Sequence, residues 1–299
     1  MLTENNWLSY SFDDGPIYGK KLSAESKFKF HILPNVKLKN LSYADSLKNN
    51  ASIMRDNFSD PFDVLLSGGI DSEVIVRTFH NLGIKQNVVT FRLENNYNVR
   101  DVAAAQSICQ ELNIPLKIID WNLEQWINNN AYDAYQNSYC PMLEKMIRFG
   151  WLDYLDNIPI FGEGEPYWRI NDNGQWQFHW GEDDFIAGIN GRNTGRTVIG
   201  EWYAYTPEVC VGFSKLPLIK KLIANEIPGK VSSWSSRSLI HQAIWPSIKH
   251  RPKMVGYEGQ NGAPATKPQF LDDFYNRVMQ KNQCTVYKYT PDEMQGWFK

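Results

Sequence analysis

Several features that would assign this chain to a broad class are missing from its sequence. We expect no signal peptide, and no C-x-x-C pair occurs among the four cysteines, which are Cys109, Cys140, Cys210 and Cys284. We therefore expect reduced thiols in a cytoplasmic protein. No apolar run approaches the ~18 residues that a membrane-spanning helix needs, so we expect no membrane partner.

Neither basic nor acidic residues are in large excess. The 31 Lys and Arg residues nearly balance the 33 Asp and Glu residues, and the net charge is −2 at pH 7. Nucleic-acid-binding domains are usually strongly basic, so this balance argues against a nucleic-acid partner. The 299 residues, of which 42% are hydrophobic, can bury a sizeable core in one large domain or two small ones.

Two catalytic and metal-binding signatures are absent as well. No G-x-S-x-G sequence occurs, so nothing in the chain argues for a Ser-His-Asp triad of that kind. The five histidines lack the spacing of a zinc site; they are His31, His80, His179, His241 and His250. We interpret His179, which lies close to Glu182-Asp183-Asp184, as part of a polar loop.

What the sequence does contain is a strand–loop–helix unit around two adjacent glycines. The letters of residues 63–72 are D-V-L-L-S-G-G-I-D-S. Residues 62–66 form a short apolar run that fits a buried parallel strand. A helix is expected from Glu73 onward, with Asp71 or Ser72 available to cap it.

This loop has the composition of a phosphate-binding site. Gly68 and Gly69 let backbone N–H groups approach an anion closely, and the helix behind them adds the positive end of its dipole. The hydroxyls of Ser67 and Ser72 can donate hydrogen bonds to phosphate oxygens. Asp71 would repel phosphate unless a cation lies between them, which suggests Mg²⁺. The loop is not a Walker P-loop, because no Lys follows the glycines.

Predicted strands and helices alternate around this unit. Hydrophobic spacing predicts helices over residues 42–58, 99–112, 123–134 and 140–148, and strands over residues 86–93, 116–119 and 158–161. This alternation predicts an α/β fold with a doubly wound parallel sheet. Ligands bind such sheets at the carboxyl ends of the strands, where Ser67, Leu93 and Gly162 fall.

The same pattern divides the chain into four regions. Residues 1–41 form a small N-terminal β addition with strands near 7–12 and 27–33, and residues 42–166 form the phosphate-binding α/β core. Residues 167–206 are an insertion that opens with a β-hairpin around Asn173-Gly174. Residues 207–299 are a mainly helical C-terminal part that completes the site. Its expected elements are helices at 216–227, 235–245 and 270–282 and a strand at 285–289.

Four tryptophans give the insertion an unusual aromatic content; they are Trp168, Trp176, Trp180 and Trp202. The segment is otherwise too polar to be core. We expect these rings to form an aromatic wall of a substrate pocket.

Two more stretches of the sequence carry candidate functional groups. Residues 161–167 read F-G-E-G-E-P-Y and follow a predicted parallel strand, so a carboxylate there would face the same crevice as Ser67. A cluster of cations, Lys249, Arg251 and Lys253, follows a predicted helix that ends at Pro246. By itself this cluster is typical of a solvated basic surface.

These segments carry a family resemblance. The S-G-G-x-D-S loop closely resembles the signature of the PP-loop ATP pyrophosphatases, which cleave ATP between the α and β phosphates. Taken in order, the three segments resemble the synthetase domain of asparagine synthetase and β-lactam synthetase, over roughly residues 42–260 with a gap at the insertion. The resemblance implies an adenine nucleotide α-hydrolase-like fold, with ATP and Mg²⁺ as cofactors.

The resemblance also implies a role for individual residues. The residues that would bind ATP and its pyrophosphate are Ser67, Gly68, Gly69, Asp71, Ser72, Arg251, Gly162 and the backbone near Val89 and Phe91. Asp71 would also ligate Mg²⁺. Glu163 would lie beside the acyl substrate or the incoming amine, and Lys253 would stabilise charge on the α-phosphate and acyl group.

The implied reaction is AMP-forming ligation, in which a carboxylate is adenylated and its acyl group passes to ammonia or an amine. Glutamine-dependent relatives begin with a nucleophilic Cys after the initiator Met, whereas Leu2 follows Met1 here. Ammonia would therefore come free or from a separate glutaminase, and an amine substrate would need neither.

The second motif departs from the family pattern. After Gly162-Glu163-Gly164 the family has a small residue and then Asp-Glu, whereas this chain has Glu165, Pro166 and Tyr167. The second metal-binding carboxylate is therefore either Glu165 or missing. Since the aspartate-recognition pattern is not visible either, we do not expect asparagine to be the product.

Two other functions remain open at this stage. One is modification of a nucleobase or tRNA by a PP-loop enzyme, although such relatives usually carry C-x-x-C pairs. The other is nucleotide or partner binding without catalysis, which the loss of the Asp-Glu pair favours and the retention of Asp71 and Lys253 opposes.

Overall fold

The computed structural model describes most of the chain between Trp7 and Gly296. The described residues are 7–12, 15–16, 28–32, 36–58, 61–131, 133, 143–181, 185, 187–188, 191, 195–227, 229–230, 232–233, 237–249 and 286–296. Arg251, Lys253 and the helix expected over 270–282 lie outside them.

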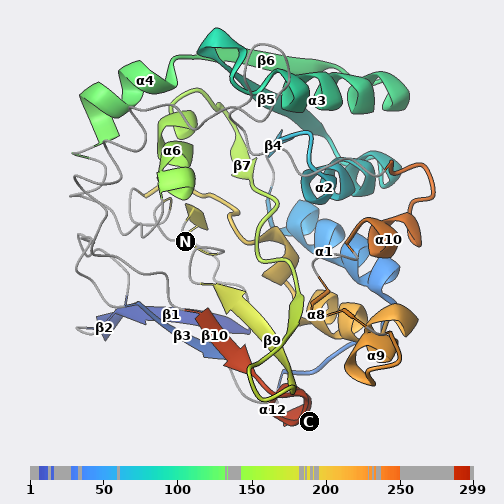
Figure 1. The fold of residues 1–299 in the computed structure, drawn as a ribbon. Helices are drawn as coiled ribbons and strands as arrows, with labels where there is room; N and C mark the ends of the chain where they lie inside the picture. Colours follow the sequence, from blue (N-terminus) through green and yellow to red (C-terminus); the bar gives the residue numbers. More distant parts are fainter. Residues whose placement is uncertain are drawn as a thin grey trace.

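A four-stranded parallel sheet forms the centre of the fold (Figure 1). Its strands are β4 (Phe62–Leu65), β5 (Gln86–Leu93), β6 (Leu116–Trp121) and β7 (Ile158–Ile160). They lie in the order β6-β5-β4-β7, and every neighbouring pair is parallel. The predicted α/β class with a parallel sheet is confirmed.

Helices connect these strands. They are α1 (Tyr43–Asn57), α2 (Ile70–Asn81), α3 (Val99–Leu112), α4 (Leu123–Trp126) and α6 (Leu143–Leu152). The helix expected over 123–134 is α-helical only over α4 and continues as a π-helix at Ile127–Ala131. Ser42 caps α1, because its hydroxyl accepts a hydrogen bond from the N–H of Asp45 at 3.1 Å.

The start of α2 differs from the prediction. The helix begins at Ile70, and its N-cap is Gly69 in an extended conformation. Asp71 and Ser72 therefore lie in the first helical turn, and neither caps the helix. The Ser72 hydroxyl instead donates to the Gly69 carbonyl at 3.0 Å, and it accepts from the N–H of Ser67 at 3.2 Å.

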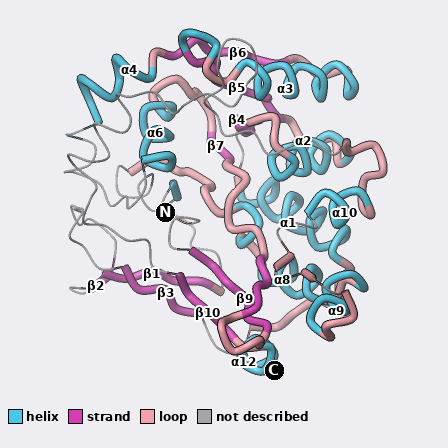
Figure 2. Tube along the Cα trace, in the orientation of Figure 1, coloured by secondary structure: helices cyan, strands magenta, loops and turns pink. Residues whose placement is uncertain are grey.

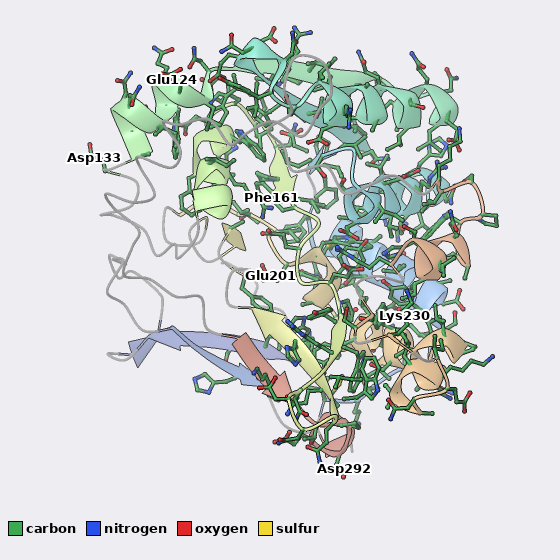
Figure 3. All side chains as sticks on the ribbon, in the orientation of Figure 1. Glu124, Asp133, Phe161, Glu201, Lys230 and Asp292 are labelled. Carbon is green, nitrogen blue, oxygen red and sulfur yellow. The ribbon has the colours of Figure 1, made fainter. Side chains whose placement is uncertain are left out.

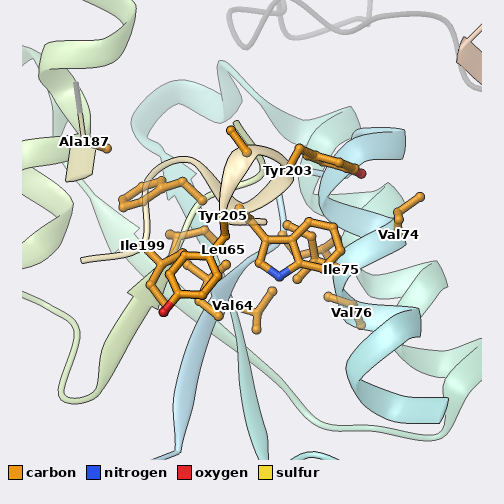
Figure 4. Packing of buried hydrophobic residues seen from close by; sticks show 14 of the residues in the cluster. Val64, Leu65, Val74, Ile75, Val76, Ala187, Ile199, Tyr203 and Tyr205 are labelled. Atoms are coloured by element: carbon orange, nitrogen blue, oxygen red, sulfur yellow. The ribbon is translucent and has the colours of Figure 1, made fainter. Parts of the chain in front are cut away.

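Helices cover both faces of the central sheet. On one face, Val74, Ile75 and Val76 of α2 are fully buried near Val64 and Leu65 of β4 (Figure 4). On the other face, the ring of Phe91 in β5 stacks on Trp151 of α6, with the two ring centroids 4.8 Å apart. The core is therefore continuous through the sheet.

Two smaller antiparallel sheets lie away from the parallel sheet (Figures 1 and 2). In one, β1 (Leu8–Phe12) pairs with β2 (Gly15–Pro16) and with β3 (Phe28–Ile32), which confirms the expected N-terminal strands. In the other, β9 (Trp176–Gly181) lies between β8 (Tyr167–Ile170) and β10 (Val286–Tyr289).

The predicted hairpin and tail strand are both confirmed, and they share the last of these sheets. Asn171 turns the chain between β8 and β9, because its side-chain oxygen accepts from the N–H groups of Asn173 and Gln175. His179 lies in β9 and is buried, so its interpretation as part of a polar loop was wrong. It pairs across the sheet with Lys288 of β10, a partner that its neighbours in the sequence could not reveal.

Short helices complete the described chain. They are η4 (Trp202–Ala204), α8 (Pro207–Ser214), α9 (Pro217–Ile223), α10 (Arg237–Gln242) and α12 (Pro291–Gly296). Helix α8 packs on α1, and α10 packs on α2. Both α9 and α10 are shorter than predicted. None of the helices within the described residues is long and apolar enough to span a membrane.

The four tryptophans of the insertion are part of the core, and the predicted aromatic wall is wrong. Their exposed fractions run from 0% for Trp202 to 5% for Trp176. Trp180 packs against Trp7 with ring centroids 5.5 Å apart, and its indole N–H donates to the Gly164 carbonyl at 3.2 Å. Their faces are filled by other side chains, so they leave no open wall for a substrate.

Candidate active site

The strand order places a topological switch point between β4 and β7. From β4 the chain proceeds outward through β5 to β6, and then returns to place β7 on the other side of β4. Connections on the two sides of a switch point lead away from each other, which opens a crevice at the carboxyl ends of the strands. The loop at 66–69 follows β4 and the residues 161–166 follow β7, so both motifs meet at this crevice.

The glycine loop after β4 is held by its own serines. The hydroxyls of Ser67 and Ser72 lie 3.1 Å apart, and the N–H of Gly69 donates to the Ser67 hydroxyl at 3.3 Å. Ser67 and Gly69 are exposed to solvent. The hydroxyls and N–H groups that the sequence assigns to phosphate therefore gather at the start of α2, where Ser67 and Gly69 are exposed and Ser72 is buried.

Two glycines of the site allow close backbone contacts. Gly68 has a φ of +73°, and a Cβ atom there would lie 2.4 Å from the carbonyl oxygen of Asp101 in the first turn of α3. A Cβ atom on Gly162 would lie 3.3 Å from the backbone nitrogen of Ser72. The second motif therefore packs directly against the start of α2. Such a contact is expected if Gly162 binds the nucleotide, as the family resemblance implies.

Four charged side chains converge beside the loop. The guanidinium of Arg237, from α10, forms ion pairs with both Asp71 and Glu165. The Nε2 atom of His241, one turn further along α10, lies 3.2 Å from Glu165 Oε1 and 3.6 Å from Asp71 Oδ1. Since Arg237 and His241 belong to the same helix, α10 presents two nitrogen groups to carboxylates from two different motifs.

Burial makes these contacts strong. The side chains of His241 and Glu165 are 0% and 8% exposed, so their charges are poorly screened by water. Burial opposes the positive charge on His241, but its interactions with Asp71 and Glu165 outweigh burial and raise the imidazole pKa. Burial also opposes the charge on Arg237, and the same two carboxylates outweigh it and raise that pKa.

Tyr203 ties the two motifs together. Its hydroxyl donates to the backbone carbonyl of Asp71 at 2.8 Å, and its N–H donates to the carbonyl of Glu163 at 3.0 Å. Burial, then the nearby Tyr43, Asp71 and Glu165, raise the pKa of the Tyr203 hydroxyl, so it remains a donor. Tyr203 belongs to η4, so the insertion contributes to the site through its backbone and this hydroxyl.

The carboxylate of Glu163 contacts a different helix from the carboxylate of Glu165. It is 6% exposed and forms an ion pair with Arg148 of α6, whose guanidinium lies 5.6 Å from the centroid of the Phe161 ring. Beyond Phe161, Glu201 lies between the central sheet and β9 (Figure 3). Its backbone bridges to Gly162. Phe161 and Glu163 therefore contact α6, whereas Glu165 contacts α10.

The β5 residues assigned to adenosine have their carbonyls engaged within the protein. The Val89 carbonyl accepts from the N–H of Leu66 at 2.8 Å, and the Phe91 carbonyl accepts from the Asn98 side chain at 2.8 Å. Both side chains are buried. These contacts brace the strand next to the loop.

The donor groups at the crevice fit a divalent cation. One oxygen each of Asp71 and Glu165 and one nitrogen of His241 all lie within 4.8 Å of one another. Carboxylates are the protein ligands that Mg²⁺ accepts. Asp71 and Glu165, both predicted as metal ligands, thus lie next to each other.

Sequence reasoning missed four residues of this site: Arg148, Tyr203, Arg237 and His241. None of them lies in a recognisable motif, and the spacing of the histidines carried no signal. The packing of α10 on α2 places Arg237 and His241 there, while Arg148 comes from α6 and Tyr203 from η4. The structure does not place Arg251 or Lys253, which lie beyond the described residues.

Comparisons with known proteins give one family match. Residues 63–145 match the model of the queuosine biosynthesis protein QueC. No curated protein matches.

Among solved structures, the chain resembles the NH3-dependent NAD synthetase from Campylobacter jejuni subsp. jejuni, with 16% identity and a TM-score of 0.31, over 80% of this chain and 93% of that chain. It also resembles the NMN synthetase from Francisella tularensis, with 14% identity and a TM-score of 0.29, over 81% and 94% of the two chains. Scores this low carry no argument about either fold or function.

No comparison singles out asparagine synthetase. The QueC match begins at Asp63 in β4 and includes the whole S-G-G-x-D-S loop. The similarity to QueC therefore covers the segment that resembles the PP-loop signature, which lies at the carboxyl edge of the parallel sheet.

Proposed function

We propose that this protein is an ATP-dependent, AMP-forming carbon–nitrogen ligase that adenylates a carboxylate and transfers its acyl group to ammonia or an amine. The observation that carries the proposal is the convergence of Asp71 and Glu165. These carboxylates come from two separate motifs, and they meet at the switch point beside the S-G-G-x-D-S loop. An ordinary glycine-rich turn does not require a carboxylate from a second motif beside it.

The proposed reaction has two steps. First, an oxygen of the substrate carboxylate attacks the α-phosphorus of ATP. The bond to the bridging α,β oxygen breaks, and pyrophosphate leaves with the electron pair. Second, the amine nitrogen attacks the acyl carbon, the bond from that carbon to the phosphate oxygen breaks, AMP leaves with the electron pair, and the nitrogen releases a proton to solvent.

The loop would bind the leaving pyrophosphate. Ser67 and Ser72 would turn their hydroxyls from each other toward phosphate oxygens, and the N–H groups at Gly68 and Gly69 would add further donors. Fixed donors of this kind favour the developing charge without reorganising during the reaction. By the family resemblance, Lys253 would stabilise charge on the α-phosphate and acyl group, Arg251 would bind ATP and its pyrophosphate, and Glu163 would lie beside the acyl or amine group.

Asp71 and Glu165 would hold Mg²⁺. When bound, the ion would neutralise phosphate charge that the two carboxylates would otherwise repel. Both carboxylates are paired with Arg237, so the guanidinium and the ion would compete for the same two carboxylates.

A second candidate function is supported by the QueC match. That family is named for queuosine biosynthesis, so a PP-loop enzyme acting on a nucleobase or tRNA remains a candidate here. The match covers the loop and the two strands after it, which ATP-using relatives of several kinds could share. The lack of any C-x-x-C pair and the net charge of −2 favour the ligase.

The nucleotide products distinguish these functions. We would incubate the protein with ATP, Mg²⁺, amino acids or other carboxylates, and ammonia or amines, and separate the nucleotides by chromatography. The ligase hypothesis predicts AMP and pyrophosphate in a 1:1 ratio. ADP as the sole product would contradict it, and AMP formation that requires RNA or a nucleobase would favour the second candidate.

Two variants locate the activity. Asp71→Asn and Lys253→Ala should each lower the rate of AMP formation by ~10²-fold, as expected for loss of one preorganised charge contact. The matched control is Asp56→Asn, since this residue is exposed near the end of α1 and pairs only with its neighbour Arg55 among the described residues. Its rate should equal that of the wild type.

A further inference from the structure

We propose that Asp71, Glu165 and His241 form a binding site for a divalent transition-metal ion, such as Mn²⁺, which takes a nitrogen ligand from His241 and binds more tightly than Mg²⁺. The proposal deepens the ligase hypothesis, on which its role in ATP use rests. It adds a third ligand and a metal preference to the two carboxylates. Its test uses metal binding alone, so it can fail or succeed independently of turnover.

The geometry brings three different ligand atoms to one point. The His241 Nε2 atom lies 3.2 Å from Glu165 Oε1 and 3.6 Å from Asp71 Oδ1. The three atoms all lie within 4.8 Å of one another. Ligand atoms about 2 Å from a shared ion are about 3 Å apart, so the present spacing needs only small side-chain adjustments.

The elements that supply these ligands are anchored. Asp71 lies in the first turn of α2, and Tyr203 holds its backbone carbonyl at 2.8 Å. Glu165 follows Gly164, whose carbonyl accepts from the indole of Trp180. His241 lies on α10, which packs on α2, and its side chain is fully buried. A rigid set of ligands limits the entropy lost when an ion binds.

The ligand types favour a transition metal over Mg²⁺. Magnesium prefers oxygen ligands and retains much of its water, whereas imidazole nitrogen suits later divalent metals. A site that offers two carboxylates and one imidazole therefore binds Mn²⁺, Co²⁺ or Zn²⁺ more tightly than Mg²⁺. Because the His241 ring has no exposed surface, replacing its nitrogen with a water ligand would require room that the packing does not leave.

In the structure, Arg237 is ion-paired with both carboxylates of the proposed site. Its guanidinium contacts Asp71 Oδ2 and Glu165 Oε2, whereas His241 lies nearest to Asp71 Oδ1 and Glu165 Oε1. A divalent ion bound to the same carboxylates would repel the guanidinium across a short distance. Arg237 therefore has to leave at least one carboxylate when the ion binds, and Arg237→Gln should raise metal affinity by roughly tenfold because the competing charge is gone.

The test is a titration of chelator-treated protein with Mn²⁺, followed by electron paramagnetic resonance, without ATP. We expect one tightly bound Mn²⁺ per chain. Pulsed measurements on that ion should detect coupling to a ¹⁴N nucleus of imidazole. Mg²⁺ should displace the ion only at roughly tenfold or greater excess. These measurements use the wild-type protein and therefore do not depend on whether a variant folds.

Two variants assign the nitrogen. His241→Asn should remove the ¹⁴N coupling and weaken Mn²⁺ binding by roughly 10- to 100-fold while changing Mg²⁺ affinity little. The matched control is His80→Asn, because His80 is an exposed histidine in the last turn of α2. It should leave both the coupling and the affinity unchanged.

Several outcomes would contradict the metal-site proposal. A single bound Mn²⁺ without ¹⁴N coupling, or coupling that disappears in His80→Asn instead, would overturn the role of His241. Failure to bind Mn²⁺ would overturn the site itself. None of these results bears on whether ATP is converted to AMP, so loss of this proposal and loss of the ligase hypothesis can be told apart.

Discussion

His179 is a buried histidine in β9, and its burial makes the stability of the fold depend on pH. Burial, followed by the charges of Lys288 and Arg169, lowers its pKa from the ordinary value of 6.5 to about 4. Between these two values the unfolded chain binds a proton that the folded chain does not bind. The free energy of unfolding should therefore decrease as pH falls from about 6.5 to about 4, by up to about 3 kcal/mol for this residue.

The measurement is urea denaturation across this pH range. His179→Gln should flatten the pH dependence, because glutamine does not titrate. His80→Gln is the control, since His80 is exposed on α2 and should leave the slope as it is in the wild type. Equal slopes in His179→Gln and the wild type would show that another group carries the effect.

At the scale of secondary-structure elements, Asp63 joins three strands at the amino edge of the central sheet. Its carboxylate in β4 accepts from the Asn87 side chain at 3.0 Å, from the Asn157 N–H at 2.9 Å and from the Asn157 side chain at 2.8 Å. Asn87 belongs to β5, and Asn157 directly precedes β7. A single buried side chain thus sets the register of β4 with both of its neighbours.

Replacing Asp63 should affect stability and leave the site unchanged. Asp63→Ala leaves buried donors without an acceptor, and we expect a loss of about 2–3 kcal/mol in the free energy of unfolding by urea denaturation. Mn²⁺ affinity below the melting temperature should not change, because the metal ligands lie at the opposite end of the strands. Asp56→Ala, at an exposed position in α1, is the matched control. A variant as stable as the control would mean that water or neighbouring groups replace the carboxylate.

At the scale of the whole molecule, the N-terminal sheet is bound to the rest of the fold through Trp7. The Trp7 indole N–H donates to the Ala204 carbonyl at 3.0 Å, and its ring packs on Trp180 of β9. Ala204 follows Tyr203, which contacts both motifs of the site. A chain of buried contacts therefore runs from the first described residue to the crevice.

Removing this ring should destabilise the protein strongly. We expect Trp7→Ala to lower the free energy of unfolding by about 3–5 kcal/mol, because a fully buried ring is replaced by a cavity. Trp7→Phe keeps most of the packing but loses the hydrogen bond and part of the ring, so it should cost less, about 1–2 kcal/mol. Guanidinium denaturation measures both. A Trp7→Ala variant within about 1 kcal/mol of the wild type would mean that the N-terminal sheet contributes little to the cooperative unit.

Local sequence patterns predicted the central elements well. The helix at 99–112 and the strand at 86–93 have the predicted bounds, and the hairpin at Asn173-Gly174 and the tail strand are present. In each of these segments the hydrophobic period or the turn residues agree with the final environment. The errors arose where a distant partner decides the environment, as for His179 against Lys288 and for the tryptophans of the insertion.

The sequence by itself determined the α/β order and predicted a phosphate-binding loop, because both depend on residues adjacent in the chain. It also identified Asp71 and Glu165 as candidate metal ligands, through motifs that each span fewer than ten positions. Only the tertiary structure decided that these carboxylates meet, and that Arg237 and His241 from α10 meet them there. The sequence of a helix does not indicate which carboxylates will lie opposite it. For α10 this depends on its packing on α2 and on the strand order, which places β7 beside β4.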